Sequence, residues 1–293
     1  MEDRPAGSVL TRSRRGALRY GFAYSVNPYR GCPHACAYCY ADSVTRDGRP
    51  WGSALDRKVG APQVLSRELQ TAPKGLVMLS SATDPYPPEE VRSRLTEGCL
   101  RALREARFPV SILTRSPLVL RDLPLLQGFP GVEVGFSFTS SRDRPDLEPR
   151  VPPVASRLRA IRQLSRSGVP TFASVAPLLP GTSGEDLRTL VEALWGAGVR
   201  AAFADPLSLS SYPAAARRMR ALGARPFGPG EAEHLLSGLE VEAGKVGLPV
   251  YRRLFAWRPD AVPPRRDGSP AFRTGARFDL LSRPAEGLPG RAP

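Results

Sequence analysis

The sequence contains little cysteine, histidine and lysine, and it has no long apolar run. Four cysteines and two histidines in 293 residues are too few for the disulfide framework of a small secreted domain. No apolar run approaches the roughly 18 residues of a membrane span. Residues 1–20 are charged and lack the apolar stretch of a secretory signal. These absences predict a soluble, cytoplasmic protein with no membrane association.

Lysine is scarce, but arginine makes the chain strongly basic. The lysines are Lys58, Lys74 and Lys245. Of the 42 Lys and Arg residues, 42 − 3 = 39 are therefore arginine, and the chain has 28 acidic residues. The formal net charge is +14, and the arginines are spread along the chain. A solvated arginine-rich surface and a phosphate-binding face both account for this composition. A nucleic-acid partner therefore stays open at this point.

Short apolar runs alternate with helical patterns between residues 20 and 210. The runs are typical of strands that are buried on both faces, and the segments between them repeat apolar residues at helical spacing. The sequence predicts six strands, at residues 20–27, 76–82, 109–116, 132–140, 171–181 and 199–207, and helices at 88–106, 154–168 and 184–198. Because alternating strands and helices pair in parallel through crossovers, we expect an α/β fold, either an open barrel or a doubly wound sheet.

The pattern also predicts where the chain divides. Residues 1–17 are expected to be a mobile basic arm, and residues 18–210 are expected to form the α/β core. The pattern of residues 211–261 predicts a helical C-terminal extension without a further strand. Residues 262–293 are rich in Pro, Gly and Arg, which is typical of a disordered tail.

Three of the four cysteines, Cys32, Cys36 and Cys39, lie close together directly after the first predicted strand. A structural zinc site takes four ligands, commonly as two separated pairs, and the sequence has one such cluster. Three thiolates suit a [4Fe–4S] cluster, which normally takes one cysteine on each iron. The fourth iron would then lack a protein ligand and would be open to a cofactor or substrate. The fourth cysteine, Cys99, falls on the apolar face of a predicted helix and is expected to pack in the core.

The run Cys32-Pro-His-Ala-Cys36-Ala-Tyr38-Cys39, with the segments SVNPYRGCPHACAYCYA and SSATDPYPPEE, resembles the radical S-adenosylmethionine (SAM) superfamily. It is similar in particular to the spore-photolyase-like branch and its actinobacterial relatives. The resemblance covers about residues 20–257. It implies a partial (β/α)6 TIM-like barrel, a [4Fe–4S] cluster on the three cysteines, and SAM bound at the open iron. It also implies that a one-electron donor such as flavodoxin or ferredoxin drives reductive cleavage of SAM, giving a 5′-deoxyadenosyl radical that takes a hydrogen atom from the substrate.

The resemblance also implies which residues contact SAM. Tyr38 matches a position beside the adenine, with simple packing as its alternative. Thr83 and Asp84 follow the second strand, where Asp84 is expected to accept a hydrogen bond from the SAM ammonium, although an Asp before Pro also serves in turns. Ser137 is a candidate for the ribose or carboxylate. Arg150 is a candidate for the carboxylate because guanidinium forks match carboxylates.

Two nearby residues and one substitution complete these expectations. Arg157 competes with Arg150 for the SAM carboxylate, and Glu148 is a candidate to orient Arg150. Ser81 stands where spore photolyases carry the cysteine that returns a hydrogen atom to the repaired base. Because an O–H bond is much stronger than an S–H bond, repair of a spore photoproduct is not expected. The catalytic residues and the substrate stay open among nucleic acid, peptide and small molecule.

A second function belongs to a different class. The chain could be a non-catalytic, zinc-stabilised nucleic-acid-binding protein, in which His34 or His234 completes the ligand set of the three clustered cysteines. The missing second pair of ligands and the alternating architecture argue against it. The sequence leaves open the electron donor, the oligomeric state and whether SAM is consumed or regenerated.

Overall fold

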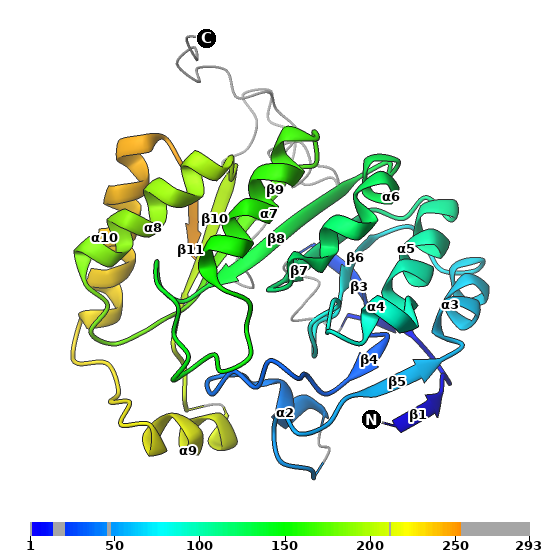
Figure 1. Ribbon diagram of the computed structural model, residues 1–293, viewed down its shortest axis with the longest axis horizontal. Helices are drawn as coiled ribbons and strands as arrows, with labels where there is room; N and C mark the ends of the chain where they lie inside the picture. The colour runs from blue at the N-terminus through cyan, green and yellow to red at the C-terminus, as the bar shows by residue number, and fades with distance from the viewer. Residues whose placement is uncertain (1, 14–20, 46–47, 211, 253–293) are drawn as a thin grey trace.

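Strands and helices alternate through most of the chain (Figure 1). The structure, a computed structural model, describes residues 2–13, 21–45, 48–210 and 212–252. The expected tail at residues 262–293 lies outside the described residues. The strands are β1 (Glu2–Pro5), β2 (Leu10–Arg12), β3 (Phe22–Val26), β4 (Tyr29–Arg30), β5 (Asp56–Val59), β6 (Leu76–Leu79), β7 (Val110–Thr114), β8 (Val132–Phe138), β9 (Thr171–Leu178), β10 (Ala201–Pro206) and β11 (Val250–Arg252). The helices are α2 (Ala41–Thr45), α3 (Ala61–Leu69), α4 (Glu90–Ser93), α5 (Leu95–Glu105), the 3₁₀ helix η1 (Pro117–Asp122), α6 (Leu123–Gln127), α7 (Val154–Arg166), α8 (Gly184–Ala197), α9 (Pro213–Ala221) and α10 (Glu231–Val246).

The main sheet has eight strands in the order β11-β10-β9-β8-β7-β6-β3-β2. From β3 to β11 all neighbours pair in parallel, and β2 pairs antiparallel with β3 at one edge. Within the described residues β2 and β11 are edge strands and the sheet does not close. The fold is therefore the expected α/β fold with an open, partial barrel, and all six predicted strands are present.

Strand burial explains why this sheet forms. All seven residues of β8 are buried, as are all four of β6, which is what a parallel sheet covered on both faces requires. Packing within the sheet is tight at Gly135 of β8. A Cβ atom there would lie 2.2 Å from the ring of Phe172 in the neighbouring strand, so no larger residue fits this position.

Helices cover the outer side of the sheet. In Figure 1 helices α10, α8, α7, α5 and α3 follow one another from left to right, and their apolar faces join the sheet in one core cluster. The predicted helix at 88–106 is two helices, α4 and α5, because Arg94 between them adopts a left-handed conformation with φ of 49°. Cys99 in α5 is fully buried, as predicted. No helix in the described ranges has both the length and the apolar character of a membrane span.

The N-terminal segment differs from the expected mobile arm. Strand β1 pairs in parallel with β5, in a small second sheet of order β1-β5-β4. Between β1 and β2, the Glu68 carboxylate of α3 accepts hydrogen bonds from the backbone N–H groups of Val9, at 3.1 Å, and Leu10, at 2.8 Å, and from the Ser8 hydroxyl at 2.6 Å. Sequence patterns missed this segment because its strands are short and its anchor, Glu68, is distant in the sequence.

The C-terminal extension also differs from the prediction. Helices α9 and α10 form as expected, but β11 follows them and pairs in parallel with β10. Helix α10 packs on α8 and serves as the crossover between the two strands. The β/α alternation therefore continues past residue 210, and the extension is not purely helical. Strand β11 was missed because it has only three residues.

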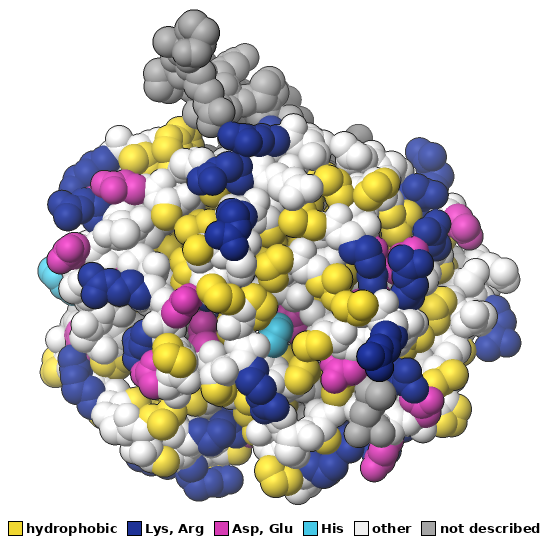
Figure 2. Space-filling model, in the orientation of Figure 1, with side chains coloured by type: hydrophobic (Ala, Val, Ile, Leu, Met, Phe, Trp, Pro, Cys, Tyr) yellow, Lys and Arg dark blue, Asp and Glu magenta, His cyan; other side chains and the backbone are white. Residues whose placement is uncertain are grey.

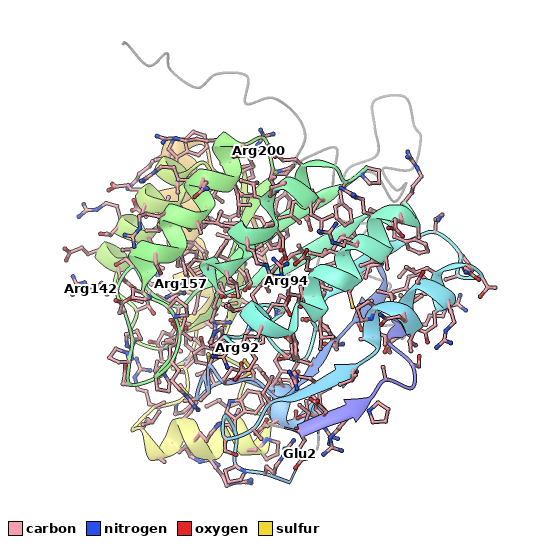
Figure 3. The ribbon with its side chains drawn as sticks, turned by 45° about the vertical axis from the view of Figure 1, so that its right-hand side comes forward. Glu2, Arg92, Arg94, Arg142, Arg157 and Arg200 are labelled. Atoms are coloured by element: carbon pink, nitrogen blue, oxygen red, sulfur yellow. The ribbon has the colours of Figure 1, made fainter. Side chains whose placement is uncertain are left out.

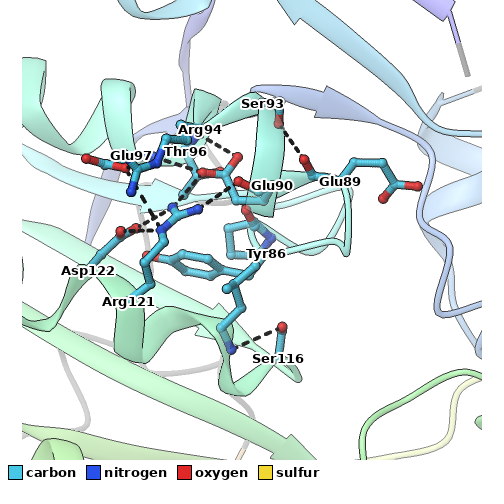
Figure 4. A network of polar contacts seen from close by, with 12 residues as sticks. Tyr86, Glu89, Glu90, Ser93, Arg94, Thr96, Glu97, Ser116, Arg121 and Asp122 are labelled. Atoms are coloured by element: carbon cyan, nitrogen blue, oxygen red, sulfur yellow. Dashed lines mark hydrogen bonds and ion pairs between the residues drawn. The ribbon is translucent and has the colours of Figure 1, made fainter.

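A buried group of polar residues ties α4 and α5 to the strands. We call it the core network, and its main members are Tyr29, Glu90 and Arg121. Figure 4 shows Glu90 and Arg121 with their neighbours Thr96 and Asp122. The Glu90 carboxylate is fully buried and accepts from the Tyr29 hydroxyl, from the backbone N–H of Thr96 at 3.1 Å and from Arg121 Nη2 at 2.8 Å. Arg121 Nε donates to Asp122 at 2.8 Å. Because Tyr29 lies in β4, this network holds the strand that leads into the cysteine segment.

Candidate active site

A cavity of about 1020 Å³ lies at the carboxyl ends of the parallel strands. Its walls come from the segment after β4, the segments that follow β6, β7 and β10, and inward-facing residues of β8 and β9. This edge is where parallel α/β folds place their ligands. Of the residues predicted to form the site, seven line the cavity: Cys32, Cys36, Cys39, Tyr38, Thr83, Asp84 and Ser137.

The cysteine loop, residues 31–40, begins directly after β4. Gly31 has φ of +83°, and a Cβ atom there would lie 2.3 Å from the Ala54 carbonyl oxygen, so glycine is required at this turn. Cys32 and Cys36 are buried, and Cys39 is half-buried. The turn thus brings three thiols to one wall of the cavity.

Backbone contacts hold the middle of the cysteine loop. The Trp51 indole N–H donates to the Cys36 carbonyl at 3.0 Å. The Ala37 N–H donates to the Leu147 carbonyl at 2.8 Å, and the Cys39 N–H donates to the Cys36 carbonyl at 3.2 Å. Residues distant in the sequence therefore fix the backbone of the loop.

Burial determines the ionisation of the clustered thiols. It raises the pKa of Cys32, with a further rise from the Asp84 carboxylate nearby. It raises the pKa of Cys36 to about 12, although the Arg115 guanidinium lowers it in part. It also raises the pKa of Cys39. Thiols bind metal as thiolates, so binding a metal centre would release their protons.

The arrangement of donors distinguishes between two kinds of metal site. Among the residues that the structure describes, no three His, Cys, Asp or Glu side chains are grouped to hold one metal ion. A zinc ion needs its sulfur ligands about 2.3 Å from one point, whereas a four-iron cluster takes each cysteine on a different iron. His34 Nδ1 faces Asp84 Oδ2 at 3.5 Å, and His234 is exposed on α10. The donor set therefore fits the cluster better than the zinc alternative.

Asp84 is buried beside the cysteine loop, and both of its oxygens accept hydrogen bonds. Oδ1 accepts from the Tyr86 N–H at 2.8 Å and from the Thr114 hydroxyl at 2.7 Å, and Oδ2 accepts from the Arg115 N–H at 2.8 Å. These donors hold the carboxylate in one orientation at the cavity wall. A contact with the SAM ammonium would add to them, and that role stays a prediction.

The segment after β6 lies against the cysteine loop. The Thr83 hydroxyl donates to the Gly31 carbonyl. Ser81, at the position where a hydrogen-donating cysteine was considered, lines the cavity. Its hydroxyl accepts from Asn27 Nδ2 at 3.3 Å, and its carbonyl accepts from the Tyr40 hydroxyl at 2.7 Å. Thr83 therefore supports the turn at the start of the loop.

A second buried group of polar residues lies beside the cavity. We call it the cavity network, and it consists of Tyr38, Arg115, Glu148 and Arg157. The Tyr38 hydroxyl donates to Glu148 and accepts from Arg115 Nη2 at 2.8 Å. Arg157 Nη2 lies 3.5 Å from Glu148 Oε2, and Arg115 Nε lies 3.7 Å from Glu148 Oε1. The Nε atoms of Arg115 and Arg157 are buried and have no hydrogen-bond partner.

Ser137 and Arg157 meet at strand β8. Ser137 is buried, lines the cavity and lies in register with Ser174 of β9. Its carbonyl accepts from Arg157 Nη1 at 2.5 Å. Arg157 is nearly inaccessible and in Figure 3 lies inside the molecular outline, whereas Arg142 lies at its edge. Arg157 thus reaches the back of the cavity wall.

Arg150 does not take the position that the sequence suggested. It is exposed, its Nη2 donates to the Gly52 carbonyl at 2.6 Å, and it is absent from the described residues that line the cavity. Glu148 contacts Arg115 and Arg157 instead of orienting Arg150. The physical reason is that Glu148 lies on the buried side of the 142–151 loop and Arg150 on its solvent side.

Sequence reasoning missed Arg115, which lines the cavity and joins Tyr38 to the strands. A signal was present, because Arg115 immediately follows a predicted strand at the edge where ligands bind. The outer part of the cavity was missed as well. There Tyr40 and Tyr212 lie with ring centroids 5.4 Å apart, and Leu207, Leu209 and Phe227 complete the wall.

The sequence profile of the radical SAM superfamily matches residues 26–194. Because this is more than half of the chain, the protein belongs to the radical SAM superfamily. Members of this superfamily use a [4Fe–4S] cluster and SAM, so these are the cofactors of the protein. The matched region contains the cysteine loop and both arginines of the cavity network.

Curated relatives share part of their length with this chain. An uncharacterized protein of Methanocaldococcus jannaschii is 34% identical over 164 residues, which are 55% of this chain and 62% of that protein. An uncharacterized protein of Mycobacterium tuberculosis is 35% identical over 191 residues, which are 60% of this chain and 56% of that protein. The radical SAM Nα-GlyT isomerase of Pseudomonas phage M6 is 28% identical over 191 residues, 64% of this chain and 40% of the isomerase. The chain thus spans less than two thirds of these relatives.

Solved structures share the fold. Spore photoproduct lyase complexed with a dinucleoside spore photoproduct superposes with a TM-score of 0.63 at 16% identity, over 85% of this chain and 81% of that chain. SuiB of Streptococcus suis, bound to SAM, superposes with a TM-score of 0.55 at 13% identity, over 80% of this chain and 52% of the SuiB chain. The open α/β barrel described above is therefore a radical SAM fold of the spore-photolyase-like type.

Proposed function

We propose that this radical SAM enzyme binds its [4Fe–4S] cluster through Cys32, Cys36 and Cys39 and holds SAM in the adjoining cavity. One observation carries the proposal: three cysteines of one loop, two of them buried and one half-buried, line the cavity at the carboxyl ends of the parallel strands. The chemistry supplied by the bound cluster and SAM is reductive cleavage of SAM for hydrogen abstraction from a substrate. An external one-electron donor, of the flavodoxin or ferredoxin kind, is needed to supply the electron.

The residues around the loop have distinct roles in this proposal. Arg115 replaces Arg150 as the candidate for the SAM carboxylate, because it lines the cavity and its Nε atom lacks a hydrogen-bond partner. Asp84 remains the candidate for the ammonium, held in place by its three donors. Ser137 remains the candidate for the ribose or carboxylate. Glu148 and Arg115 fix the Tyr38 ring, which is the candidate to pack beside the adenine.

We further propose that the substrate is a base of a nucleic acid. The Tyr40–Tyr212 pair at the outer part of the cavity offers aromatic faces on which bases stack. The net charge of +14 favours a polyanion. On the face seen in Figure 2 the Lys and Arg side chains are spread among acidic ones and form no single patch. The proposal therefore rests on the aromatic pair more than on a basic groove.

The hydrogen-return step of spore photoproduct repair is not part of this proposal. Ser81 stands at the corresponding position and lines the cavity. Its hydroxyl is a poor hydrogen-atom donor because of the strong O–H bond. We therefore propose a lyase-like or isomerising reaction on a base that needs no thiol at residue 81.

The test begins with anaerobic reconstitution of the full chain with iron and sulfide, followed by SAM and dithionite. We expect a brown protein that produces 5′-deoxyadenosine. A colourless protein holding one zinc ion per chain would reject the enzyme in favour of the zinc-binding alternative.

The substrate class is tested with deuterated donors. Deuterated DNA, RNA and peptide fractions are offered to the reconstituted enzyme, and the 5′-deoxyadenosine formed is analysed by mass spectrometry. Deuterium from the DNA or RNA fraction supports the nucleic-acid proposal. Deuterium from the peptide fraction alone would overturn that proposal and leave the SAM chemistry intact.

A further inference from the structure

Helix α9 contributes one arginine to the cysteine loop, although 181 positions separate Arg218 from Ala37. Arg218 Nε donates to the Ala37 carbonyl at 3.0 Å. Its Nη2 donates to the Cys39 carbonyl at 2.8 Å. One guanidinium therefore holds the two peptide carbonyls on either side of Tyr38.

The guanidinium is itself fixed by two further contacts. Its Nη1 donates to the Asp42 carboxylate of α2, and its Cζ lies 5.8 Å from the centre of the Trp51 ring. Helices α2 and α9 lie side by side at the lower edge of Figure 1. Because all three nitrogens of Arg218 have acceptors, the side chain is held in one orientation. A lysine would offer a charge but not this planar fork.

The segment from Ala37 to Cys39 is thus held from two directions. Arg218 holds its backbone from α9. The cavity network holds the Tyr38 side chain from the strands, through Glu148 and Arg115. Neither anchor lies within the cysteine loop. The position of the Cys39 sulfur therefore depends on a helix that lies outside the region matched by the superfamily profile, residues 26–194.

We propose that Arg218 is a positioning residue for the iron–sulfur centre, and that its charge makes this centre easier to reduce. The positioning role rests on geometry, because the three hydrogen bonds of Arg218 end on the cysteine loop and on its neighbour Asp42. The second part follows from charge. A cation held near the ligand thiolates stabilises the more negative, reduced state, and the potentials of such clusters depend on nearby charge and hydrogen bonds.

This inference rests on the proposed function where it concerns the cluster, so its test includes a measurement that needs no cluster. Three variants are compared with the wild type. Arg218→Gln removes the charge and the fork, and Arg218→Lys keeps the charge alone. Arg220→Gln removes an exposed arginine from the same helix and is the matched control. Circular dichroism establishes that each variant is folded.

The first measurement is amide hydrogen exchange in the full chain without iron. In Arg218→Gln we expect exchange in residues 36–43 to be faster by about tenfold, because the variant loses the charge-assisted hydrogen bonds that hold this backbone. Arg218→Lys should show an intermediate increase, and Arg220→Gln none. Wild-type exchange in Arg218→Gln would overturn the positioning role, whether or not the proposed function holds.

The second measurement uses reconstituted protein. Redox titration followed by electron paramagnetic resonance gives the midpoint potential, and a chelator challenge gives the rate of cluster loss. We expect Arg218→Gln to have a more negative potential and severalfold faster cluster loss. Arg218→Lys should retain the wild-type potential but lose its cluster faster. An unchanged midpoint potential in Arg218→Gln would overturn the electrostatic role. If neither the wild type nor Arg220→Gln assembled a cluster, the proposed function would be rejected instead.

Discussion

The core network and the cavity network use the same kinds of side chain, a tyrosine, a glutamate and arginine, yet they differ in how completely their donors are used. In the core network Arg121 donates from all three nitrogens, to Glu90 and to Asp122. In the cavity network Arg115 donates to Tyr38, but its Nε has no hydrogen-bond partner. Buried polar groups are normally satisfied. Because Arg115 also lines the cavity, its Nε atom, which lacks a hydrogen-bond partner, is the reason we propose that the cavity network meets a ligand.

The two networks also place different charges beside a buried thiol. Burial and, to a smaller extent, the Glu90 carboxylate raise the pKa of Cys99 to about 12, whereas Lys58 acts to lower it. Burial raises the pKa of Cys36 to a similar value, but there the Arg115 guanidinium acts in the opposite direction. A nearby cation favours the thiolate that binds metal, and a nearby carboxylate opposes it. The neighbouring charge alone does not separate a ligand from a packing residue, because the Asp84 carboxylate also raises the pKa of Cys32, a proposed ligand.

The largest expected effect comes from the thiols themselves. Cys36→Ala should reduce 5′-deoxyadenosine formation to the background rate, because the cluster loses a ligand. Cys99→Ala should keep wild-type turnover per folded molecule and lose about 1 kcal/mol of unfolding free energy, from the apolar surface removed. Chromatography of the nucleoside and urea unfolding measure the two quantities. A selective loss of turnover in folded Cys99→Ala would contradict the assignment of Cys99 as a packing residue.

Substitutions of Arg121 and Arg115 should have different effects on the free energy of unfolding and on SAM binding. Arg121→Met should cost about 3–5 kcal/mol of unfolding free energy, because it leaves the fully buried Glu90 carboxylate with an unpaired charge. Arg115→Met should cost less, about 1–2 kcal/mol, since Glu148 keeps Arg157. We expect Arg115→Met to lower kcat/KM for SAM by about 100-fold, equivalent to one strong charged contact. Equal losses of stability in both variants would show that the cavity network is merely structural.

The tyrosines test the same contrast with a smaller change. Tyr29→Phe removes a donor from the Glu90 carboxylate and should cost about 1–3 kcal/mol in urea unfolding. Tyr38→Phe should cost about 0.5–1.5 kcal/mol, because Glu148 also accepts from the Thr139 hydroxyl at 3.2 Å. Tyr38→Phe should instead raise KM for SAM severalfold. A wild-type KM would remove Tyr38 from the SAM site.

The smallest effect is a change in the slope of stability with pH. Burial, followed by the Glu90 charge, raises the pKa of Tyr29 above its ordinary value of 10.0. Its contribution to stability is therefore fully present below the unfolded pKa and is lost as pH rises above it. Tyr29→Phe should flatten the decline in urea midpoint above about pH 10. An unchanged slope would mean that the Tyr29 hydroxyl is not held in the core network.

Local patterns predicted a large part of the molecule. The six strands β3 and β6 to β10, and helices α7 and α8, were recognisable because burial on both faces leaves continuous apolar runs and helices repeat their apolar residues. The short strands β1, β2 and β11 were not, since none of their residues is buried and they leave no apolar run. What holds them is pairing with distant strands and, near β2, the carboxylate of Glu68.

By itself the sequence determined the chemical class of this protein, because the thiols for a cluster can be supplied by one short loop whose spacing is visible in the chain. It also determined that Cys99 would pack, from its place on an apolar helix face. Only the tertiary structure decided that Arg115, and not Arg150, faces the cavity, and that Arg218 reaches the cysteine loop. A side chain's direction and its distant neighbours depend on how separate elements pack together, and residue spacing along the chain carries no record of that packing.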